Sequence, residues 1–384
     1  NCPKPVLVIQ SATMKITIQD LADHLGISKG TVSRALRGYA DVSASTVERV
    51  QQAAKELGYQ PSAVAQGIKT GLARSVGLIL LPKSRAARRP FLMQFINGIS
   101  TSIAKHGYTL TVATAQSDAE MLELHRDLFV QRKVDGFILP RTMHNDPRIQ
   151  ILDQLKAPLV LYGQTENLTQ YSWFDINQVE CFRRATTRLL NFGHRHLAFL
   201  GGDAPLFYNS LRRKGVEFGI REFDRGEVQL QVFENITTVA DGLECALRLL
   251  QSSQPPTCFL CALDLSALGV IRAIKQLELI PGEHVSVIGY EGIPEGEFSE
   301  PSLTTFEVDQ YEAGFQCGVK LMQLIHEKGV KVTGTLTMAV LLERGSDGPV
   351  RFNSSELATF IRNRKRLLSS QEKLHRMTEK SLRN

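Results

Sequence analysis

The stretch TIQDLADHLGISKGTVSRALR at residues 17–37 constrains the fold of this chain more than any other segment. Its first half places apolar residues at the spacing of one helix face, namely Ile18, Leu21, Ala22 and Leu25. Gly26 supplies a sharp bend after this face, and Ser28 is a favourable N-cap for a second helix. The segment therefore predicts two short helices joined by a tight turn.

The predicted second helix has two contrasting sides. Val32 and Leu36 form an apolar side. The opposite side carries basic, hydroxyl-bearing or small residues, namely Lys29, Gly30, Thr31, Ser33, Arg34 and Arg37. A helix that reads the major groove of DNA needs such a face on an apolar support. The pattern is typical of a helix-turn-helix, and a solvated helical hairpin is the alternative.

A third amphipathic helix favours the helix-turn-helix. Ser45 and Glu48 have the spacing of a capping box, and the helix is expected to end at Gly58. Its apolar positions are Val47, Val50, Ala54 and Leu57. We assign residues 14–60 to a three-helix DNA-binding domain, because Pro61 breaks the helical pattern.

From residue 75 the pattern changes to short apolar strands that alternate with amphipathic segments of helix length. The expected strands are 76–81, 108–114, 136–139, 158–162, 197–200, 257–262 and 285–289. Such alternation predicts parallel sheets with right-handed crossovers. We predict an α/β body over residues 75–348 with two sub-domains, divided near Gly163 and again near Glu291. Because ligands bind at the carboxyl ends of parallel strands, two facing sheets predict a ligand cleft.

Composition and motifs argue against several other classes of protein. With 384 residues and 43% hydrophobic content the chain can bury the cores of two or three domains. No apolar run reaches the length of a membrane span. The nucleophile elbow, the phosphate-binding loop, the zinc-protease motif and the dinucleotide-binding loop are all missing from the sequence. We therefore expect a cytoplasmic protein that is not an enzyme and needs no cofactor.

The cysteines give no sign of a metal or redox site. Six cysteines without a regular framework fit a reducing compartment. Cys258 and Cys261 form an isolated C-x-x-C, but they lie in a predicted buried strand and no second pair follows. Buried structural thiols are the better interpretation, and no metal site is predicted.

The net charge of +6 is unevenly distributed. Residues 14–74 hold eight basic and five acidic residues, whereas residues 349–384 hold nine basic and three acidic residues. A mildly basic head on a slightly acidic body fits a DNA-binding module attached to a sensor. Residues 349–384 are predicted to form a basic, partly helical and largely disordered tail. A tetramerising coiled coil is the alternative for this tail. Residues 1–13 precede Met14 and are interpreted as an extension.

Several further strings, in this order, resemble the lactose-repressor-like (LacI/GalR) family of transcriptional regulators. Besides the helix-turn-helix they are ELGYQPSAVAQGIKTG (56–71), VGLILLP (76–82), VDGFILP (134–140), GHRHLAFLGG (193–202) and VSVIGYEGIPEGEFSEPSLTTF (285–306). The resemblance spans residues 15 to about 348. It implies a homodimer on a near-palindromic operator of double-stranded DNA, and a periplasmic-binding-protein-like body that closes on a small effector.

The resemblance also implies which residues bind DNA. Base edges would meet Lys29, Gly30 and Arg34, and the Arg34 guanidinium can bind guanine through two hydrogen bonds. Phosphates would be held by Thr17, Thr31 and Ser33, with Arg37 on the same helix face. Residues 61–74 would form a hinge helix and linker, in which Ile68 matches an apolar wedge inserted between base pairs beside Lys69. A plain flexible linker is the alternative for this segment.

Residues that follow the predicted strands are the candidates for effector contacts. They are Phe91, Leu92, Arg141, Trp173, Asp175, Asn177, Arg212, Leu263, Asp264 and Glu291. Arginines, carboxylates and amides can bind vicinal hydroxyls, and an aromatic ring can cover the apolar face of a sugar. Arg212 matches the arginine that holds the ligand in relatives. Structural roles are the alternatives: a surface ion pair for Arg141 or Arg212, a helix cap for Asp175, core packing for Phe91 and burial beneath a crossover for Trp173.

These observations predict a DNA-binding transcriptional regulator, in particular a repressor of carbohydrate uptake or catabolism genes that responds to a sugar-like effector. Leu263 and Glu291 stand where the family usually has Asn and Asp, so the same sugar is not expected in the same pose. The rivals are a sugar-active enzyme with an added helical head and a periplasmic sugar carrier. The enzyme would need a phosphate loop or a metal cluster, and neither is found in the sequence. The carrier would need a signal peptide, which is also not found, and it would have no use for the helical head.

Overall fold

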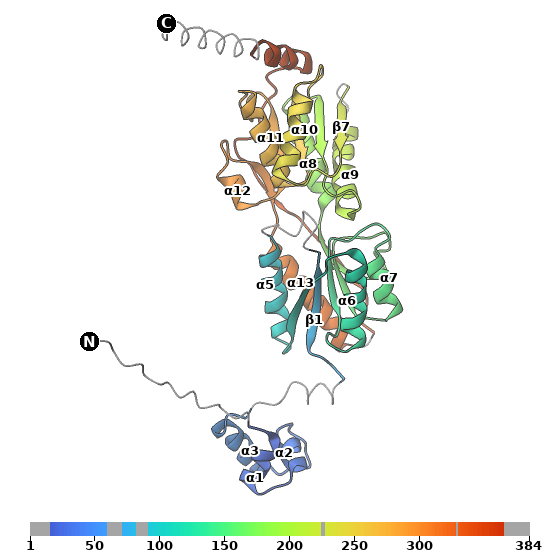
Figure 1. The fold of residues 1–384 in the computed structure, drawn as a ribbon, viewed down its shortest axis with the longest axis vertical. Coiled ribbons are helices and arrows are strands. Elements are labelled where there is room, and N and C mark those ends of the chain that lie inside the picture. The colour runs from blue at the N-terminus through green and yellow to red at the C-terminus, as the bar shows by residue number, and fades with distance from the viewer. Residues whose placement is uncertain (1–15, 60–70, 82–90, 224–226, 328, 365–384) are drawn as a thin grey trace, which may run out of the picture. The chain divides into compact units, whose positions relative to one another are not determined.

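The computed structural model describes residues 16–59, 71–81, 91–223, 227–327 and 329–364, and the chain divides into two compact units, 1–73 and 74–384 (Figure 1). In the described part of the chain, no helix is long and apolar enough to cross a membrane.

The first unit is the expected three-helix domain. It contains α1 (Ile18–Leu25), α2 (Lys29–Ala35) and α3 (Ala44–Glu56), packed around the buried side chains of Leu21, Ala22, Val32, Ala35, Val50 and Ala53. Gly26 ends α1 with a φ of 65°, a conformation that glycine adopts without steric cost. The Ser28 hydroxyl accepts a hydrogen bond from the backbone N–H of Thr31 and caps α2. The tight turn and the second helix are therefore confirmed.

The predicted start of the third helix is wrong by two residues. The N-cap of α3 is Ser43, whose hydroxyl accepts from the backbone N–H of Thr46 at 3.3 Å. Ser45 lies inside the first turn of α3, so it cannot form a capping box with Glu48. Ser43 and Ser45 lie within one turn and both can cap a helix, so the sequence alone did not show which of them is the N-cap.

The second unit contains two six-stranded sheets. The sheet of the N-subdomain has the order β11-β5-β4-β3-β1-β2, with β1 Ser75–Leu80, β2 Thr109–Thr114, β3 Phe137–Pro140, β4 Leu159–Tyr162, β5 Ser172–Ile176 and β11 Gly334–Thr337. Its helices are α5 (Phe91–Ala104), α6 (Asp118–Val130), α7 (Pro147–Gln154) and α13 (Gln310–His326). Helices α5 and α13 cover one face of the sheet, and α6 and α7 cover the other (Figure 1).

The C-subdomain repeats this arrangement. Its sheet has the order β12-β10-β9-β8-β6-β7, with β6 His196–Leu200, β7 Gln229–Phe233, β8 Cys258–Cys261, β9 Ser286–Glu291, β10 Thr304–Glu307 and β12 Val340–Leu342. Its helices are α8 (Gln178–Asn191), α9 (Phe207–Glu222), α10 (Val239–Leu250), α11 (Asp264–Gln276) and α12 (Pro294–Glu297). Neighbouring strands run parallel except for β10 and β12. The predicted α/β class with two parallel sheets is confirmed.

The predicted dividing points between the sub-domains are wrong. Strand β5 still belongs to the N-subdomain and β10 still belongs to the C-subdomain, so the chain crosses near residues 177 and 309 and not near 163 and 291. A third crossing lies near residue 338, between β11 and β12. The cause is that β5 and β10 carry Ser, Asp, Thr and Glu, which weaken the apolar signal of a strand.

Both cysteines of the C-x-x-C lie in β8 and are fully buried, as predicted. The tail differs from its prediction at its start. Residues 354–364 are helical, and Leu357 and Ile361 are buried in the core that α10 and α11 share. The folded body therefore extends beyond residue 348, because two apolar positions four residues apart give this segment a face to bury.

Candidate DNA-binding helix and ligand pocket

Helix α2 presents the polar face that the sequence predicted. Val32 and Ala35 are buried against the other two helices, which leaves Lys29, Gly30, Arg34 and Arg37 exposed and Thr31 and Ser33 partly exposed. Leu36, expected on the buried side, is only half-buried and caps the end of the helix. The exposed face carries Lys29 and Arg34 on the seven-residue helix, and Arg37 follows just after its C-cap.

Several side chains of this face already have partners within the domain. The Arg34 Nε lies 3.4 Å from Asp41 Oδ2, with both side chains about half exposed. Arg37 donates to the Ser33 hydroxyl. The Thr31 hydroxyl lies 2.9 Å from that of Ser28.

Thr17 has a structural role at the start of the first helix. It forms a capping box with Asp20, in which each residue accepts a hydrogen bond from the other's backbone. Ile68 and Lys69 lie outside the described residues.

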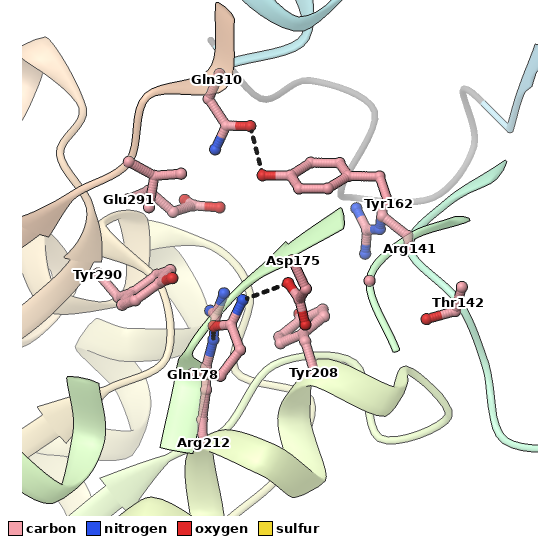
Figure 2. A pocket seen from close by; sticks show the side chains of 12 residues that line it. Arg141, Thr142, Tyr162, Asp175, Gln178, Tyr208, Arg212, Tyr290, Glu291 and Gln310 are labelled. Carbon is pink, nitrogen blue, oxygen red and sulfur yellow. Dashed lines mark hydrogen bonds between the residues drawn. The ribbon is translucent and has the colours of Figure 1, made fainter. Parts of the chain in front are cut away.

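A polar pocket lies where the two sub-domains meet. Side chains at the ends of β3, β4, β5 and β9 converge there with the first turns of α8 and α13 and the first two turns of α9 (Figure 2). Its lining residues are Arg141, Thr142, Tyr162, Gly163, Asp175, Gln178, Tyr208, Arg212, Tyr290, Glu291, Val308 and Gln310. The carboxyl ends of parallel strands thus form the predicted cleft.

Arg212 is the buried cation of this pocket. Its Nε donates to Gln178 Oε1 at 2.8 Å, and its Nη1 donates to the carbonyl oxygen of Ala262. Its guanidinium carbon lies 3.9 Å from the ring centroid of Tyr290 and 4.3 Å from that of Tyr208. Two aromatic rings and two acceptors hold the group in one orientation, and no described residue accepts a hydrogen bond from its remaining nitrogen, Nη2.

Asp175 is the buried carboxylate of the pocket. It accepts from Gln164 Nε2 at 3.0 Å, from the backbone N–H of Ile176 at 2.8 Å and from Gln178 Nε2 at 3.2 Å. Burial raises its pKa to about 6, although these hydrogen bonds and the charge of Arg212 act in the opposite direction. Gln178 therefore bridges Asp175 and Arg212 (Figure 2).

Tyrosines form much of the remaining wall. The Tyr162 hydroxyl donates to Gln310 Oε1 at 2.8 Å and so joins β4 to α13. The hydroxyls of Tyr208 and Tyr290 are buried and have no hydrogen-bond partner among the described residues. Buried hydroxyls without a partner are costly unless a ligand or water completes them. Two buried hydroxyls therefore adjoin the pocket without a hydrogen-bond partner among the described residues, and that of Tyr208 lies close to Gly202.

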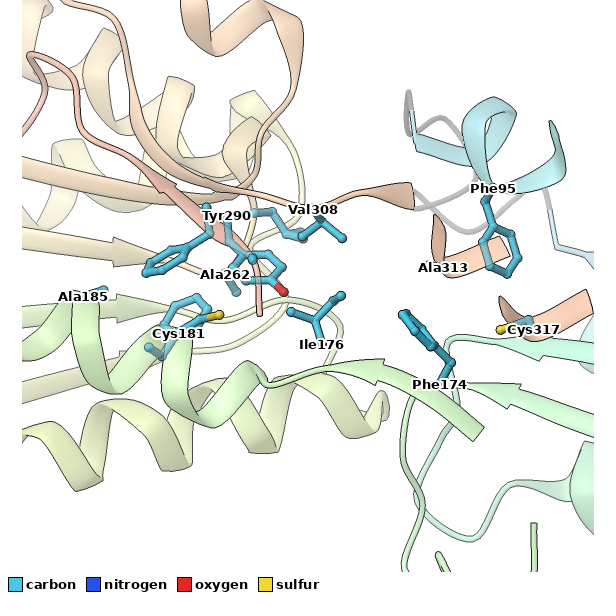
Figure 3. Close-up of a cluster of buried hydrophobic side chains, with 14 of the residues drawn as sticks. Phe95, Phe174, Ile176, Cys181, Ala185, Ala262, Tyr290, Val308, Ala313 and Cys317 are labelled. Carbon is cyan, nitrogen blue, oxygen red and sulfur yellow. The ribbon is translucent and has the colours of Figure 1, made fainter. Parts of the chain in front are cut away.

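The floor of the pocket is continuous with the main core. Tyr290 and Val308 line the pocket and also belong to the largest cluster of buried side chains. Figure 3 shows Ile176 and Val308, one near each of two crossovers, between the C-subdomain residues around Cys181 and the N-subdomain residues around Phe174. The pocket is therefore supported by packing from both sub-domains.

A second, mainly apolar chamber adjoins the pocket at Arg141. Its cavity volume is about 330 Å³, compared with about 70 Å³ for the polar pocket. Its apolar lining comes from both sub-domains, namely Ile79, Leu80, Leu81, Leu92, Met121, Pro140, Met143, Pro205 and Leu206. Together the two cavities form one cleft with a polar part and an apolar part.

The structure brings together only some of the predicted effector residues. Arg141, Asp175, Arg212 and Glu291 line the polar pocket, and Leu92 lines the apolar chamber. The side chain of Phe91 lies outside the described residues.

Four predicted residues are outside both cavities. Trp173 packs in the core around α6 and α7 and covers Gly334 of β11, where a Cβ would lie 2.2 Å from its ring. Asn177 caps α8 by accepting from the backbone N–H of Glu180. Leu263 is fully buried in the core. Asp264 is also fully buried and accepts from the backbone N–H groups of Gly292 and Ile293. Burial raises its pKa to about 7.

Eight lining residues of the polar pocket were not predicted from the sequence, namely Thr142, Tyr162, Gly163, Gln178, Tyr208, Tyr290, Val308 and Gln310. Tyr162 and Tyr290 were hidden within the apolar runs of their strands. The sequence did hold a signal for two of them. Gln178 lies two residues after the end of β5, and Gln310 lies three residues after the end of β10.

Comparison with known proteins agrees with this architecture. Residues 17–62 match the model of the bacterial regulatory proteins of the lacI family, and residues 186–346 match a periplasmic-binding-protein-like domain. The HTH-type transcriptional regulator AglR of Rhizobium meliloti (strain 1021) is 31% identical over 342 residues, which cover 88% of this chain and 95% of that protein. The chain belongs to the LacI family.

Other similar proteins fit this assignment. The HTH-type transcriptional repressor PurR of Histophilus somni (strain 2336) is 28% identical over 319 residues, covering 82% of this LacI-family chain and 93% of that protein. The lac repressor dimer bound to operator and the anti-inducer ONPF superposes with a TM-score of 0.75 at 24% identity over 87% of this chain and 99% of that one, which shows the fold. The complex of the transcriptional regulator CelR with cellobiose gives a TM-score of 0.65 at 25% identity over 86% and 100%. This LacI-family protein is a DNA-binding transcriptional regulator, and not an enzyme.

Proposed function

We propose that this regulator is a homodimeric repressor of carbohydrate uptake or catabolism genes. It binds a near-palindromic operator, and a small, neutral, sugar-like effector in the cleft controls its affinity for that operator. The observation that carries the proposal is the buried group of Asp175, Gln178 and Arg212 beside two tyrosine hydroxyls that lack partners.

The charges of the pocket favour a neutral ligand. Asp175 and Glu291 bring two carboxylates to the lining, and Arg212 and Arg141 bring two guanidinium groups. Arg141 is already paired with Asp203 at 2.7 Å. A phosphate or carboxylate would therefore meet the carboxyl groups of Asp175 and Glu291 in the same lining as the guanidinium of Arg212. Vicinal hydroxyls can instead donate to a carboxylate and accept from a guanidinium at the same time.

The apolar chamber suggests the shape of the effector. A ligand with its hydroxyl-rich ring in the polar pocket would extend past Arg141 into a cavity lined by leucine, methionine and proline side chains. An apolar ring face or an apolar substituent would be favourable there. Glu291, which departs from the usual family residue and lines the polar pocket, supports a pose different from that in relatives.

The α2 face supports the proposed DNA contacts. Lys29, Gly30 and Arg34 are exposed and can approach base edges in the major groove. Arg37 and the hydroxyls of Thr17, Thr31 and Ser33 are proposed to hold phosphates. Ile68 and Lys69 are proposed to enter the minor groove from the hinge segment.

Control by the effector requires that it favour one arrangement of the two sub-domains. We expect effector binding to change their relative position and thereby the pairing of the hinge segments on DNA. A coupling free energy of about 1 to 3 kcal/mol is typical of such linkage.

The proposal is tested by a thermal-shift panel followed by footprinting. The panel contains cellobiose, other neutral sugars, sugar phosphates and guanine as a nucleobase. A neutral sugar at a hundredfold excess over its dissociation constant should stabilise the protein by about 2.7 kcal/mol. The same sugar should then change the protection of a symmetric DNA site. Stabilisation by guanine or only by sugar phosphates would refute the sugar assignment, and the absence of a symmetric protected site would refute the repressor assignment.

A further inference from the structure

We propose that Asp264 is a positioning residue for the effector site, which it serves by holding the turn that presents Glu291. The inference rests on the proposed function, because it takes Glu291 as an effector contact. Asp264 was expected to touch the effector itself, but it lies outside both cavities and is fully buried.

Three hydrogen bonds place Asp264 at the junction of three elements. Its Oδ2 accepts from the backbone N–H of Gly292 at 2.8 Å and from that of Ile293 at 2.9 Å. Its Oδ1 accepts from the Thr305 hydroxyl at 2.6 Å. The carboxylate thus ties the start of α11 to the turn after β9 and to the middle of β10.

The turn that Asp264 holds has an unfavourable backbone. Glu291 has a φ of 125° and Gly292 a φ of 74°. A positive φ is costly for a residue with a side chain and persists only where surrounding contacts enforce it. The two backbone N–H groups that follow Glu291 both donate to one carboxylate oxygen, which enforces this conformation directly.

Close packing leaves the carboxylate no alternative position. A Cβ built on Gly289 would lie 2.2 Å from Asp264 Oδ1, so β9 needs glycine where it passes this side chain. A Cβ on Gly292 would lie 2.7 Å from the Cα of Glu307, so the turn also needs glycine against β10. Glu291 thereby reaches the pocket at the end of β9, whereas Asp264 stays behind the strand.

Hydrogen exchange at residues 291–293 measures this function without any ligand. The parent protein is compared with Asp264→Ala, Asp264→Asn, Thr305→Val and Thr304→Val by mass spectrometry. Thr304→Val is the matched control, because Thr304 is also fully buried and donates a 2.6 Å hydrogen bond to a different aspartate, Asp347.

We expect Asp264→Ala to speed exchange in the turn by about tenfold or more, because two N–H groups lose a charged acceptor. Thr305→Val should give a smaller increase in the same peptide. Asp264→Asn should keep exchange slow, because its amide oxygen still accepts from both N–H groups, and Thr304→Val should leave the turn unchanged. Equal exchange in parent and folded Thr305→Val and Asp264→Ala proteins, or an equal effect of Thr304→Val, would overturn the proposal.

A second measurement connects the turn to the pocket. Thermal stabilisation by cellobiose should fall in Thr305→Val and in Glu291→Gln, and the double variant should lose no more than Glu291→Gln alone. Additive losses would overturn the link to Glu291. The exchange measurement alone decides whether Asp264 holds the turn. If cellobiose does not stabilise the parent protein, that result counts against the sugar assignment and not against the role of Asp264.

Discussion

Arg141 and Asp203 form an ion pair of 2.7 Å that joins the N-subdomain to the C-subdomain. The connection is reinforced next to the pair, where the backbone N–H of Phe207 donates to the carbonyl of Thr142 at 2.9 Å. The ion pair stands where the polar pocket meets the apolar chamber, since Arg141 lines both. Any ligand that occupies the whole cleft must therefore pass this connection.

Removing either partner of this pair should weaken the body only slightly. The side chains of Arg141 and Asp203 are 22% and 31% exposed, so water screens their attraction. A double-mutant cycle of Arg141→Ala and Asp203→Ala, followed by urea unfolding, should give a coupling of about 0.2 to 1 kcal/mol that falls with added salt. The same double-mutant cycle on Arg213 and Glu217, an exposed pair within α9, is the control for an ion pair that does not join the sub-domains. A salt-independent coupling would contradict this account.

Asp175→Asn should stabilise the protein at neutral pH. Burial raises the pKa of Asp175 from 3.8 to about 6, so the folded state binds this proton more tightly than the unfolded state. The stability that this group contributes is therefore present below about pH 4 and is lost as the pH rises to about 6. The uncharged variant should gain up to about 3 kcal/mol at pH 7.5 and almost nothing at pH 4.

Urea unfolding at the two pH values checks this prediction. Asp127→Asn, which changes an exposed carboxylate on α6, is the control for the removal of a surface charge. An Asp175→Asn variant that is less stable than the parent at pH 7.5 would show that hydrogen bonds to the charged carboxylate outweigh its burial.

The sequence predicted the elements with strong apolar periodicity and failed at the polar ones. Strands such as FILP and CFLC are buried on both faces, so their sequences are continuous apolar runs that are easily recognised. Strand β5 was missed because its Ser172 and Asp175 serve the crossover and the pocket. The same polarity displaced the predicted sub-domain boundaries.

Within the site, position after a strand was a necessary signal but not a sufficient one. Asp175 and Trp173 lie on the same strand, and the sequence predicts both as effector contacts. Only Asp175, which is nearer the end of the strand, lines the pocket. Asp264 lies three residues after the end of β8, but its carboxylate accepts from backbone N–H groups of the turn after β9. Loop geometry decides which polar side chains form hydrogen bonds with the backbone and which reach the pocket, and tertiary packing sets that geometry.

Arg212→Ala should abolish the response to the effector and leave operator affinity within about twofold of the parent. Arg212 is held by Gln178, Ala262 and two tyrosine rings, so its loss removes the one buried cation among the described residues that line the polar pocket. Operator titrations with and without the stabilising sugar provide the measurement. Arg213→Ala, which removes the exposed neighbouring arginine, should respond normally. A normal response in Arg212→Ala would show that the effector binds elsewhere.

Arg34→Ala should weaken operator binding by about 1 to 3 kcal/mol and non-specific binding very little. The reason is that a guanidinium paired to a guanine edge contributes only at the correct base. Arg34 now pairs with Asp41 at 3.4 Å, and this exposed contact is weak enough for DNA to replace it. Arg49→Ala removes the same charge from an exposed position on α3, so it should lower both affinities equally. Gel-shift titrations on operator and random duplexes at one salt concentration separate the two effects, and an equal loss on both duplexes for Arg34→Ala would exclude base recognition by this residue.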